Sequence, residues 1–227
     1  MKINRAMATE AALKLLNQIG LEQLTLRRLG EELGVQAATL YWHFKSKEEL
    51  LDEMATTVLT QGAPHLLPRR SSADWRVWAS TYAKGLRKVL LAYRDGARMV
   101  SGTKLTTTEP LKTTEKIAAT LVASGFSLRA TVVLLTTIYN YTQSFVMEEQ
   151  AVFPTPGKRS PRYTLGERNA RLDLATFPNH RKATAILFDD YDRRYREGLQ
   201  LILNGAKPEK STKPSPRSSK HISGNHS

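Results

Sequence analysis

Apolar residues recur at intervals of three and four along almost the whole 227-residue chain. This spacing places them on one side of an α-helix, whereas a half-buried strand requires strict alternation of apolar and polar residues. Such alternation is not sustained anywhere in the sequence. We therefore predict an all-α fold of about nine or ten helices, with a small N-terminal three-helix unit and a larger helical body.

Residues that favour helix ends separate the apolar stretches. Gly20 ends the first stretch, Thr25 can cap a second that stops at Gly34, and Ser46 and Glu49 form a capping box for a fourth. Further signals predict a third helix over 36–43 and an end of the fourth helix at Pro64 and Pro68. Later helices are predicted over 72–91, 128–150 and 183–205. One helix is expected to stop and the next to be capped at 125–127, and a loop is expected over 151–166.

The predicted helices divide the chain into parts. We expect a helix-turn-helix domain over 1–47, with the fourth helix, 47–63, as a connector. A larger domain is expected over 64–205, and its helix 128–150 should be most densely packed along Val132, Leu135, Tyr139 and Val146. Residues 206–227 are rich in Lys, Ser and Pro and are expected to form a flexible basic tail.

Charge and cysteine content restrict the possible functions. The chain carries a net charge of +13, which favours an anionic partner such as nucleic acid. It has no cysteine, which excludes thiolate catalysis, zinc ribbons and iron–sulfur ligation. No apolar run approaches the roughly 18 residues of a membrane span, and Glu10 and Lys14 interrupt the stretch that a secretory signal would need. We therefore expect a cytoplasmic protein with no cofactor.

Two short helices joined at 33–35 match the helix-turn-helix plan, in which the second helix enters the major groove of DNA. If Val35, Leu40 and Phe44 face inward, a Tyr, a Trp and a His remain together on the outer surface. Exposed aromatic residues grouped in this way favour a contact surface. The residues expected to contact DNA are Arg27, Gln36, Ala37, Ala38, Thr39, Tyr41, Trp42, His43 and Lys47.

The residue types suggest separate roles in DNA binding. Gln36 and Thr39 can hydrogen-bond base edges, Ala37, Ala38 and the Thr39 methyl can approach thymine methyl groups, and Arg27 can reach a guanine. The phosphate contacts are assigned to Tyr41, His43, Lys45 and Lys47. The alternative from spacing alone is a helical hairpin that only packs, with Trp42 as an anchor in the core.

The continuous run 24–51, LTLRRLGEELGVQAATLYWHFKSKEELL, closely resembles the N-terminal domain of the TetR family of transcriptional repressors. The segments 93–97, 102–103, 125–127 and 145–150 resemble the regulatory domain of the tetracycline repressor branch of that family. The resemblance implies a homodimer built through helices near 128–150 and 183–203. It also implies that a small-molecule effector releases the protein from a palindromic operator.

The sequence departs from the tetracycline pattern where that branch binds its magnesium–drug complex. Ala63 and Val100 occupy the positions of the two histidines, and only Thr103 and Glu148 are retained from the region around the metal. Two outer groups of this kind cannot hold magnesium alone, so we predict no metal site and a larger or more apolar effector. The predicted effector residues are Tyr82, Leu86, Val100, Thr103, Ile117, Leu135, Asn140 and Glu148.

Other interpretations remain open at this level. Leu86, Val100, Ile117 and Leu135 could belong to the core rather than to a cavity. The arginine-rich segment 158–171 could meet an acidic effector or lie in solvent. An enzyme is disfavoured because GxSxG, GxGxxG, GxxxxGK and HExxH motifs are absent. A basic protein that binds DNA without sequence preference is the nearer alternative.

Overall fold

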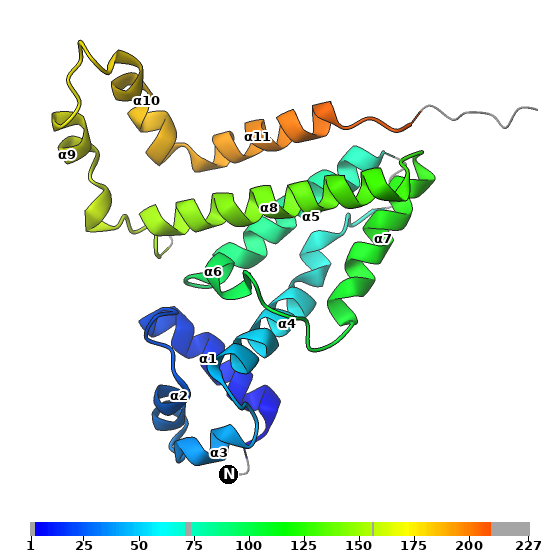
Figure 1. The fold of residues 1–227 in the computed structure, drawn as a ribbon, viewed down its shortest axis with the longest axis vertical. Helices are drawn as coiled ribbons and strands as arrows, with labels where there is room; N and C mark the ends of the chain where they lie inside the picture. Colours follow the sequence, from blue (N-terminus) through cyan, green and yellow to red (C-terminus); the bar gives the residue numbers. More distant parts are fainter. Residues whose placement is uncertain (1–2, 71–73, 156, 210–227) are drawn as a thin grey trace, which may run out of the picture.

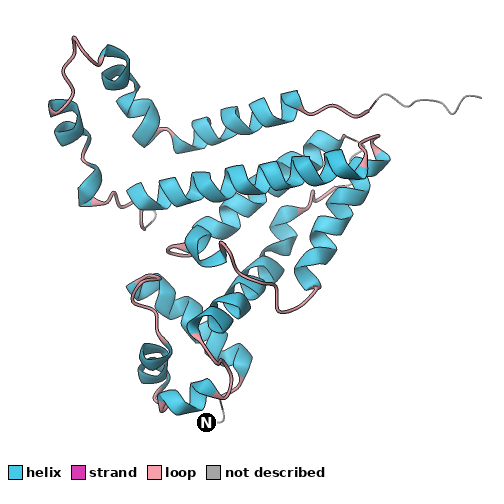
Figure 2. Cartoon of the chain, in the orientation of Figure 1, coloured by secondary structure: helices cyan, strands magenta, loops and turns pink. Residues whose placement is uncertain are grey.

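The computed structural model describes residues 3–70, 74–155 and 157–209. These residues form eleven α-helices and one 3-10 helix, η1 at Pro161–Tyr163, with no strand beyond an isolated bridge between Thr155 and Lys158 (Figures 1 and 2). The all-α prediction is confirmed. The number of helices is larger than the expected nine or ten, because the C-terminal part of the chain forms more and shorter helices than its periodicity indicates.

The N-terminal domain contains α1 (Arg5–Ile19), α2 (Leu26–Leu33) and α3 (Ala37–Tyr41), with the start of α4 (Lys47–Leu66) packed against them (Figure 1). Side chains cap three of these helices, as their types predict. Asn4 accepts from the Met7 N–H, Thr25 from the Arg28 N–H and Ser46 from the Glu49 N–H. The core of this domain is formed by Leu16, Leu24, Leu29, Leu40 and Phe44, none of which is exposed.

Helix α4 runs from the N-terminal domain into the body (Figure 1). It ends at Leu66, so the prediction that Pro64 ends it is wrong. Pro64 lacks the N–H of an ordinary helical residue, but the last turn of α4 packs closely against α5 (Trp75–Leu91). A Cβ atom at Gly85 would lie 2.0 Å from the carbonyl oxygen of His65. This contact favours continuing the helix through the proline and past the expected boundary at residue 63.

The body is built around α5 and the long helix α8 (Leu128–Val152), with α6 (Gly96–Val100) and α7 (Glu109–Ala123) beside them (Figure 1). Ser127 caps α8, as predicted, and Gly125 in the turn before it takes a positive φ of 94°. Helix α5 is capped by Asp74 and begins at Trp75, and the expected start at residue 72 lies outside the described residues. Arg87 of α5 forms ion pairs of 2.7 Å with Glu149 of α8 and with Asp192 in the helix that begins at Tyr191, so it ties three parts of the body together.

The predicted packing face of α8 is partly wrong. Val132 is 52% exposed, whereas Val146 is buried as predicted. The other buried positions of α8 include Leu134, Ile138 and Thr142. Leu135 and Tyr139 are half-buried at the edge of that face. Apolar residues lie on most of the circumference of α8, so periodicity alone does not distinguish the side that faces the body from the opposite side.

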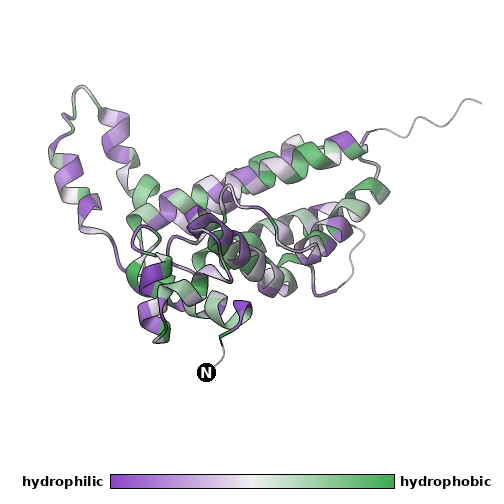
Figure 3. Cartoon of the chain, turned by 60° about the horizontal axis from the view of Figure 1, so that its bottom comes forward, coloured by the Kyte–Doolittle hydropathy of each residue, from purple (hydrophilic) through white to green (hydrophobic). Residues whose placement is uncertain are grey.

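The expected loop 151–166 and the expected single helix from 183 to 205 both need correction. The first contains the end of α8, η1 and the start of α9 (Leu165–Ala170), and the second is divided into α10 (Pro178–Asp189) and α11 (Tyr191–Gly205). The break lies at Asp190, because α10 packs on α9 whereas α11 packs on α8. We call residues 161–189 the arm. It stands away from the rest of the body and is largely hydrophilic (Figures 1 and 3).

Residues 206–209, the beginning of the expected tail, lie against the turn between α7 and α8. The Glu209 N–H donates to the Gly125 carbonyl oxygen at 3.0 Å, and Ser127 Oγ lies 2.5 Å from a Glu209 carboxylate oxygen. The rest of the expected tail, 210–227, lies outside the described residues. The described body therefore continues four residues beyond α11.

Candidate nucleic-acid interface and effector region

A tight turn sets the direction of α3 relative to α2. Gly34 ends α2 in the left-handed region, with φ 66° and ψ 33°, and the Val35 N–H donates to the Gly30 carbonyl oxygen at 2.9 Å. Gly30 is also required sterically, since a Cβ there would lie 2.9 Å from the carbonyl oxygen of Val35. These two glycines let the chain reverse within three residues, as a helix-turn-helix requires.

Helix α3 is anchored on one side and open on the other. Leu40 and Phe44 are fully buried, whereas Tyr41 is 55% and Trp42 89% exposed. The interpretation of Trp42 as a core anchor is therefore wrong. The other predicted DNA contacts on this segment are exposed (Gln36, Ala38 and Thr39) or half-buried (Ala37 and His43).

Two predicted contacts lie outside α3 and have different surroundings. The Arg27 side chain, on α2, is 80% exposed, and its ion pair with Glu31 is long, at 3.8 Å. It is free to reach DNA. Lys47 is half-buried, and its ammonium group donates to the carbonyl oxygen of Leu21 at 2.8 Å. Lys47 therefore also fixes the loop between α1 and α2, a structural role that its sequence position does not reveal.

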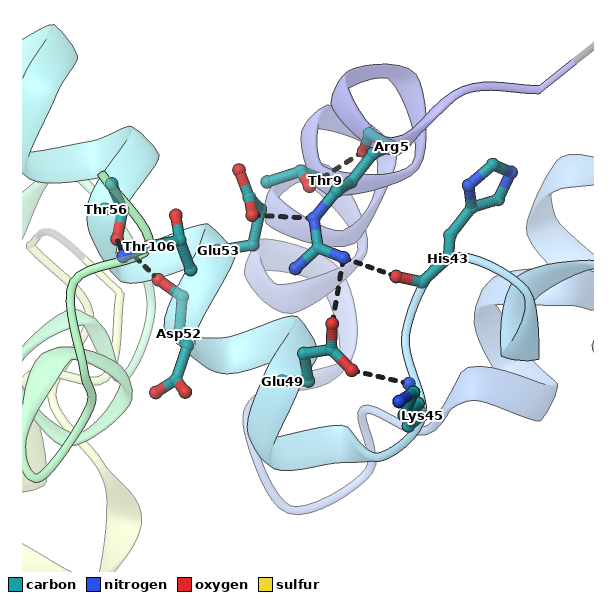
Figure 4. Close-up of polar contacts among 9 residues, drawn as sticks. All are labelled: Arg5, Thr9, His43, Lys45, Glu49, Asp52, Glu53, Thr56 and Thr106. Atoms are coloured by element: carbon teal, nitrogen blue, oxygen red, sulfur yellow. Dashed lines mark hydrogen bonds and ion pairs between the residues drawn. The ribbon is translucent and has the colours of Figure 1, made fainter.

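Arg5 connects α1 to the segment that follows α3 (Figure 4). Its guanidinium donates to the His43 carbonyl oxygen at 2.5 Å, to Glu49 at 2.9 Å and to Glu53 at 2.7 Å, and it lies 4.6 Å from the centre of the Phe44 ring. Glu49 in turn accepts from the Lys45 N–H at 2.8 Å. The bond from Lys45 and the bond from Arg5 lower the pKa of Glu49 below its usual value. We call Arg5 and the residues that these contacts join, His43, Phe44, Lys45, Glu49 and Glu53, the Arg5 clamp. Sequence reasoning missed it because Arg5 is 38 to 48 residues from the groups it binds.

Besides the chain connection through α4, hydrogen bonds join the N-terminal domain and α4 to the body at two places. At the end of α1, the Leu21 N–H donates to Asp95 Oδ2 at 2.9 Å and the Arg94 N–H donates to Asn17 Oδ1 at 2.8 Å. Along α4, Asp52 accepts from the Lys104 N–H at 2.7 Å and Thr56 from the Thr106 N–H at 2.8 Å, the second of which appears in Figure 4. The loop after α6 is thus attached to the helix that supports α3.

Four of the predicted effector residues, Tyr82, Leu86, Val100 and Ile117, are buried in the body between α5, α6, α7 and α8. Burial, with smaller contributions from Tyr139 and Tyr195, raises the pKa of Tyr82 well above its usual value, so this phenol stays neutral. Leu135 and Thr103 are half-buried, and the Thr103 hydroxyl donates to the Val100 carbonyl oxygen at 2.7 Å.

Asn140 and Glu148 lie elsewhere. Both are exposed on α8 and line a groove of about 630 Å³ between α8 and α11, together with Tyr141, Phe145 and Arg194. The structure therefore brings the eight predicted effector residues into two groups, one in the core of the body and one on the α8–α11 surface. Which of them bind a ligand stays a prediction.

Two buried polar groups in the body were not singled out by sequence reasoning. Within the described part of the chain, Thr131 Oγ1 and Gln143 Oε1 are buried without a hydrogen-bond partner. The Gln143 amide nitrogen donates to the Ala97 carbonyl oxygen at 3.1 Å, which orients the side chain towards α6. A buried acceptor without a donor costs about 1–3 kcal/mol. The available signal was the occurrence of Thr131 and Gln143 at helical spacing with the apolar residues of the buried face of α8.

Among the described residues, no three His, Asp or Glu side chains converge in a way that could hold a metal ion. The side chains of Ala63 and Val100 contain no atom that can bind a metal ion. In the ranges that the structure describes, no helix is both long and apolar enough to cross a membrane.

Comparison with known protein families matches both parts of the chain. Residues 8–54 match the family described as bacterial regulatory proteins, tetR family. Residues 67–209 match the tetracyclin repressor-like C-terminal domain. The first match ends within α4 and the second begins just after it, so the helix joins the two matched domains in the structure.

Individual relatives cover nearly the full length. The class A tetracycline repressor protein from transposon 1721 of Escherichia coli is 38% identical over 197 residues, which are 86% of each chain. A possible TetR family transcriptional regulator from Streptomyces coelicolor A3(2) has a TM-score of 0.78 and 32% identity, covering 89% of this chain and 98% of its own.

A third relative was solved with a drug. A single-residue variant of TetR from Acinetobacter baumannii AYE, in complex with minocycline, has a TM-score of 0.68 and 31% identity, covering 90% of this chain and 96% of its own. The two domain matches and these relatives agree with the exposed α3 and the helical body. The chain belongs to the TetR family of bacterial transcriptional regulators, with an N-terminal helix-turn-helix DNA-binding domain and a C-terminal ligand-binding domain.

Proposed function

We propose that this chain is a sequence-specific repressor that binds a palindromic operator as a homodimer and leaves it when a small-molecule effector binds. The observation that carries the proposal is the two-sided character of α3. Buried Leu40 and Phe44 fix the helix, while Tyr41 and Trp42 remain open to solvent. An exposed aromatic group on so short a helix is suited to the major groove and its phosphate edges.

The proposed DNA contacts follow from the exposed side chains. Gln36 and Thr39 hydrogen-bond base edges, and Ala37, Ala38 and the Thr39 methyl approach thymine methyl groups. Arg27 reads a guanine beside α3. The residues proposed to contact the phosphates or to lie against the DNA backbone are Tyr41, Trp42, His43, Lys45 and Lys47.

The test is fluorescence anisotropy of the protein on the DNA upstream of its own gene, compared with a scrambled duplex at about 150 mM salt. A preference above about a thousandfold would establish sequence-specific binding. The alternative, a basic protein that binds DNA without sequence preference, predicts a ratio near one and a steep dependence on salt. This alternative draws on the charge of residues 64–205, which hold twenty-two Lys or Arg and twelve Asp or Glu.

The homodimer is proposed to form through α8 and α11, the helices near 128–150 and 183–203. Large apolar side chains are exposed along both of them, which is unfavourable for an isolated chain in water. These side chains are Leu128, Val132, Val133 and Met147 on α8 and Leu201 on α11. A second copy is the partner that covers this surface and places two α3 helices about one turn of DNA apart.

The effector is proposed to be larger or more apolar than a magnesium–tetracycline complex. Apolar and aromatic side chains dominate the buried group of predicted contacts, and Ala63 and Val100 offer no metal ligand. The relative that was solved with minocycline supports a small-molecule ligand for a body of this fold. The proposed effector residues are Tyr82, Leu86, Val100, Thr103, Ile117, Leu135, Asn140 and Glu148.

Titration calorimetry with tetracycline, with and without magnesium, tests the effector class directly. We expect no tight magnesium-dependent binding. Tight binding that requires magnesium would overturn this part of the proposal and leave the DNA-binding part unaffected.

We place the regulator in the cytoplasm, where it would control a gene for drug efflux or antibiotic biosynthesis. Its neighbouring genes provide the first indication of which.

A further inference from the structure

The arm contains a pocket that the proposed function does not use. It has a volume of about 450 Å³ and lies between η1, α9 and α10. Its walls include three guanidinium groups, two aromatic rings, two leucines and the single carboxylate of Glu167. The arm is separate from the buried effector region in the body and from α3 (Figure 1). The pocket is therefore a separate site.

The arginines of the pocket are not neutralised by acidic side chains. Among the ion pairs that the described residues form, none involves Arg162, Arg168 or Arg171, and Glu167 forms none with them. Neighbouring arginines differ, because Arg159 is paired with Asp189 and Arg193 with Asp190. Three cations and one carboxylate around the same pocket leave an excess of positive charge, which attracts an anion.

Arg168 is held in place at the inner side of the pocket. Its guanidinium carbon lies 4.7 Å from the centre of the Phe188 ring, and Nη1 lies 3.3 Å from Thr184 Oγ1. Thr184 is only 2% exposed, so it belongs to the fixed packing between α9 and α10. Thr184 takes one of the five N–H donors of Arg168, which leaves a donor edge for a ligand.

The same pocket has an aromatic wall. The rings of Tyr163 and Phe188 are 6.3 Å apart and tilted by 36°, and Leu165 and Leu172 provide apolar surface beside them. The Arg168 guanidinium lies over one face of the Phe188 ring. A flat ring can therefore pack against Tyr163 and the remaining surface of Phe188, while an attached carboxylate meets the planar fork of Arg168. An inorganic anion or a phosphate ester chain would use the arginines but would leave the aromatic wall uncovered.

We propose that the arm pocket binds a small aromatic carboxylate, with Arg168 as the main carboxylate contact and Tyr163 and Phe188 as the stacking surface. Arg162 and Arg171, which are exposed at the rim, add electrostatic attraction. The volume suits a molecule of one or two fused rings. This site does not depend on the proposed operator or on the effector region between α5 and α8.

The test uses the full chain without DNA and 2-naphthoate as the probe, with 2-naphthamide as its neutral isostere. Calorimetry should show that wild-type protein binds the carboxylate at least tenfold more tightly than the amide. Arg168→Gln should weaken 2-naphthoate binding at least tenfold. Lys182→Gln is the matched control, because Lys182 is an exposed cation of α10 outside the pocket, and it should change the affinity less than twofold.

A second variant guards against a loss of folding in the first. Phe188→Leu keeps an apolar side chain but removes the ring, and it should weaken 2-naphthoate binding by threefold or more at an unchanged helix content by circular dichroism. Equal binding of the carboxylate and the amide by the wild type would overturn the proposal. Unchanged binding by Arg168→Gln would overturn it as well, because the probe would then occupy another part of the chain.

Discussion

Substitutions of single side chains can distinguish base reading from phosphate contact in the proposed DNA interface. Arg27 is the proposed base-reading residue and Lys45 a proposed phosphate contact. Both are exposed, and neither anchors the fold. Arg27→Ala should cost about 1–3 kcal/mol on the operator and relax the base preference at one position per half-site. Lys45→Ala should weaken operator and scrambled DNA alike and reduce the salt dependence. Anisotropy titrations of both duplexes at several salt concentrations measure these effects.

Equal losses on both duplexes for Arg27→Ala would contradict its role as a base-reading residue. Lys45 is a better phosphate-contact control than Lys47. Lys47 also holds the Leu21 carbonyl oxygen, so its replacement would disturb the loop between α1 and α2 as well as any phosphate contact.

The Arg5 clamp predicts an effect on DNA binding from a residue that does not need to touch DNA. Arg5→Ala removes the bonds to the His43 carbonyl oxygen and to Glu49, so the segment after α3 loses its support. We expect operator affinity to fall by about 1–2 kcal/mol, the net size of one or two ordinary hydrogen bonds, because α4 still supports part of this segment. The double variant with Glu49→Ala should lose less than the sum of the two single losses.

The same clamp gives stability a dependence on pH. The pKa of Glu49 in the folded protein is lowered from its usual 4.5, first by the Lys45 N–H and then by Arg5. Its stabilising contribution is therefore complete above the usual pKa and is lost as the pH falls through the lower folded value. Thermal melting between about pH 3 and 6 should show a steeper decline for the wild type than for Glu49→Gln. Parallel curves would count against the clamp.

At the level of helices, much of the fold follows from local chemistry. Thr25, Ser46 and Ser127 act as caps in the structure because each needs only a nearby backbone N–H. Helix ends set by distant packing could not be found in this way. The continuation of α4 past Pro64 depends on α5, and the break at Asp190 depends on which helices α10 and α11 meet.

The close approach of α4 and α5 can be tested by adding one methyl group. Gly85→Ala would place a Cβ atom 2.0 Å from the His65 carbonyl oxygen, so the helices must separate. We expect a loss of about 1–3 kcal/mol in the free energy of unfolding, measured in urea. Gly166→Ala on α9 is the control, because its Cβ would meet nothing within 4 Å and alanine favours helix by about 0.5–1 kcal/mol. A stabilised Gly85→Ala protein would refute this account of the packing.

For the molecule as a whole, the candidate DNA interface could be predicted from the sequence more completely than the effector region or the dimer interface. The nine predicted DNA contacts cluster on or beside α3 because they lie within 21 consecutive residues. The eight effector residues span 67 residues, and their separation into two groups depends on how α5 to α8 pack. Val132 could not be assigned to the correct side of α8, because the proposed interface between two copies would be lined by apolar residues as the core is.

The proposed α8–α11 interface predicts a loss of the dimer in Val132→Arg. An unpaired arginine inserted among Val133, Leu201 and their counterparts should raise the dimer dissociation constant at least a hundredfold, about 2.7 kcal/mol. Sedimentation velocity measures this, and operator affinity should fall with it. Leu111→Arg on α7 is the control, because Leu111 is an exposed apolar residue on another helix. A dimer that persists in Val132→Arg would place the interface elsewhere.

The contact between Glu209 and the turn before α8 has a practical consequence for anyone who attaches a reporter to this chain. The Glu209 N–H and carboxylate hold Gly125 and Ser127, and Ser127 is the cap of the helix that carries the proposed interface. A fluorescent protein or affinity tag fused directly after α11 would remove this lock at the start of α8. A junction placed beyond residue 209 preserves it, so sensor variants should be built from that point.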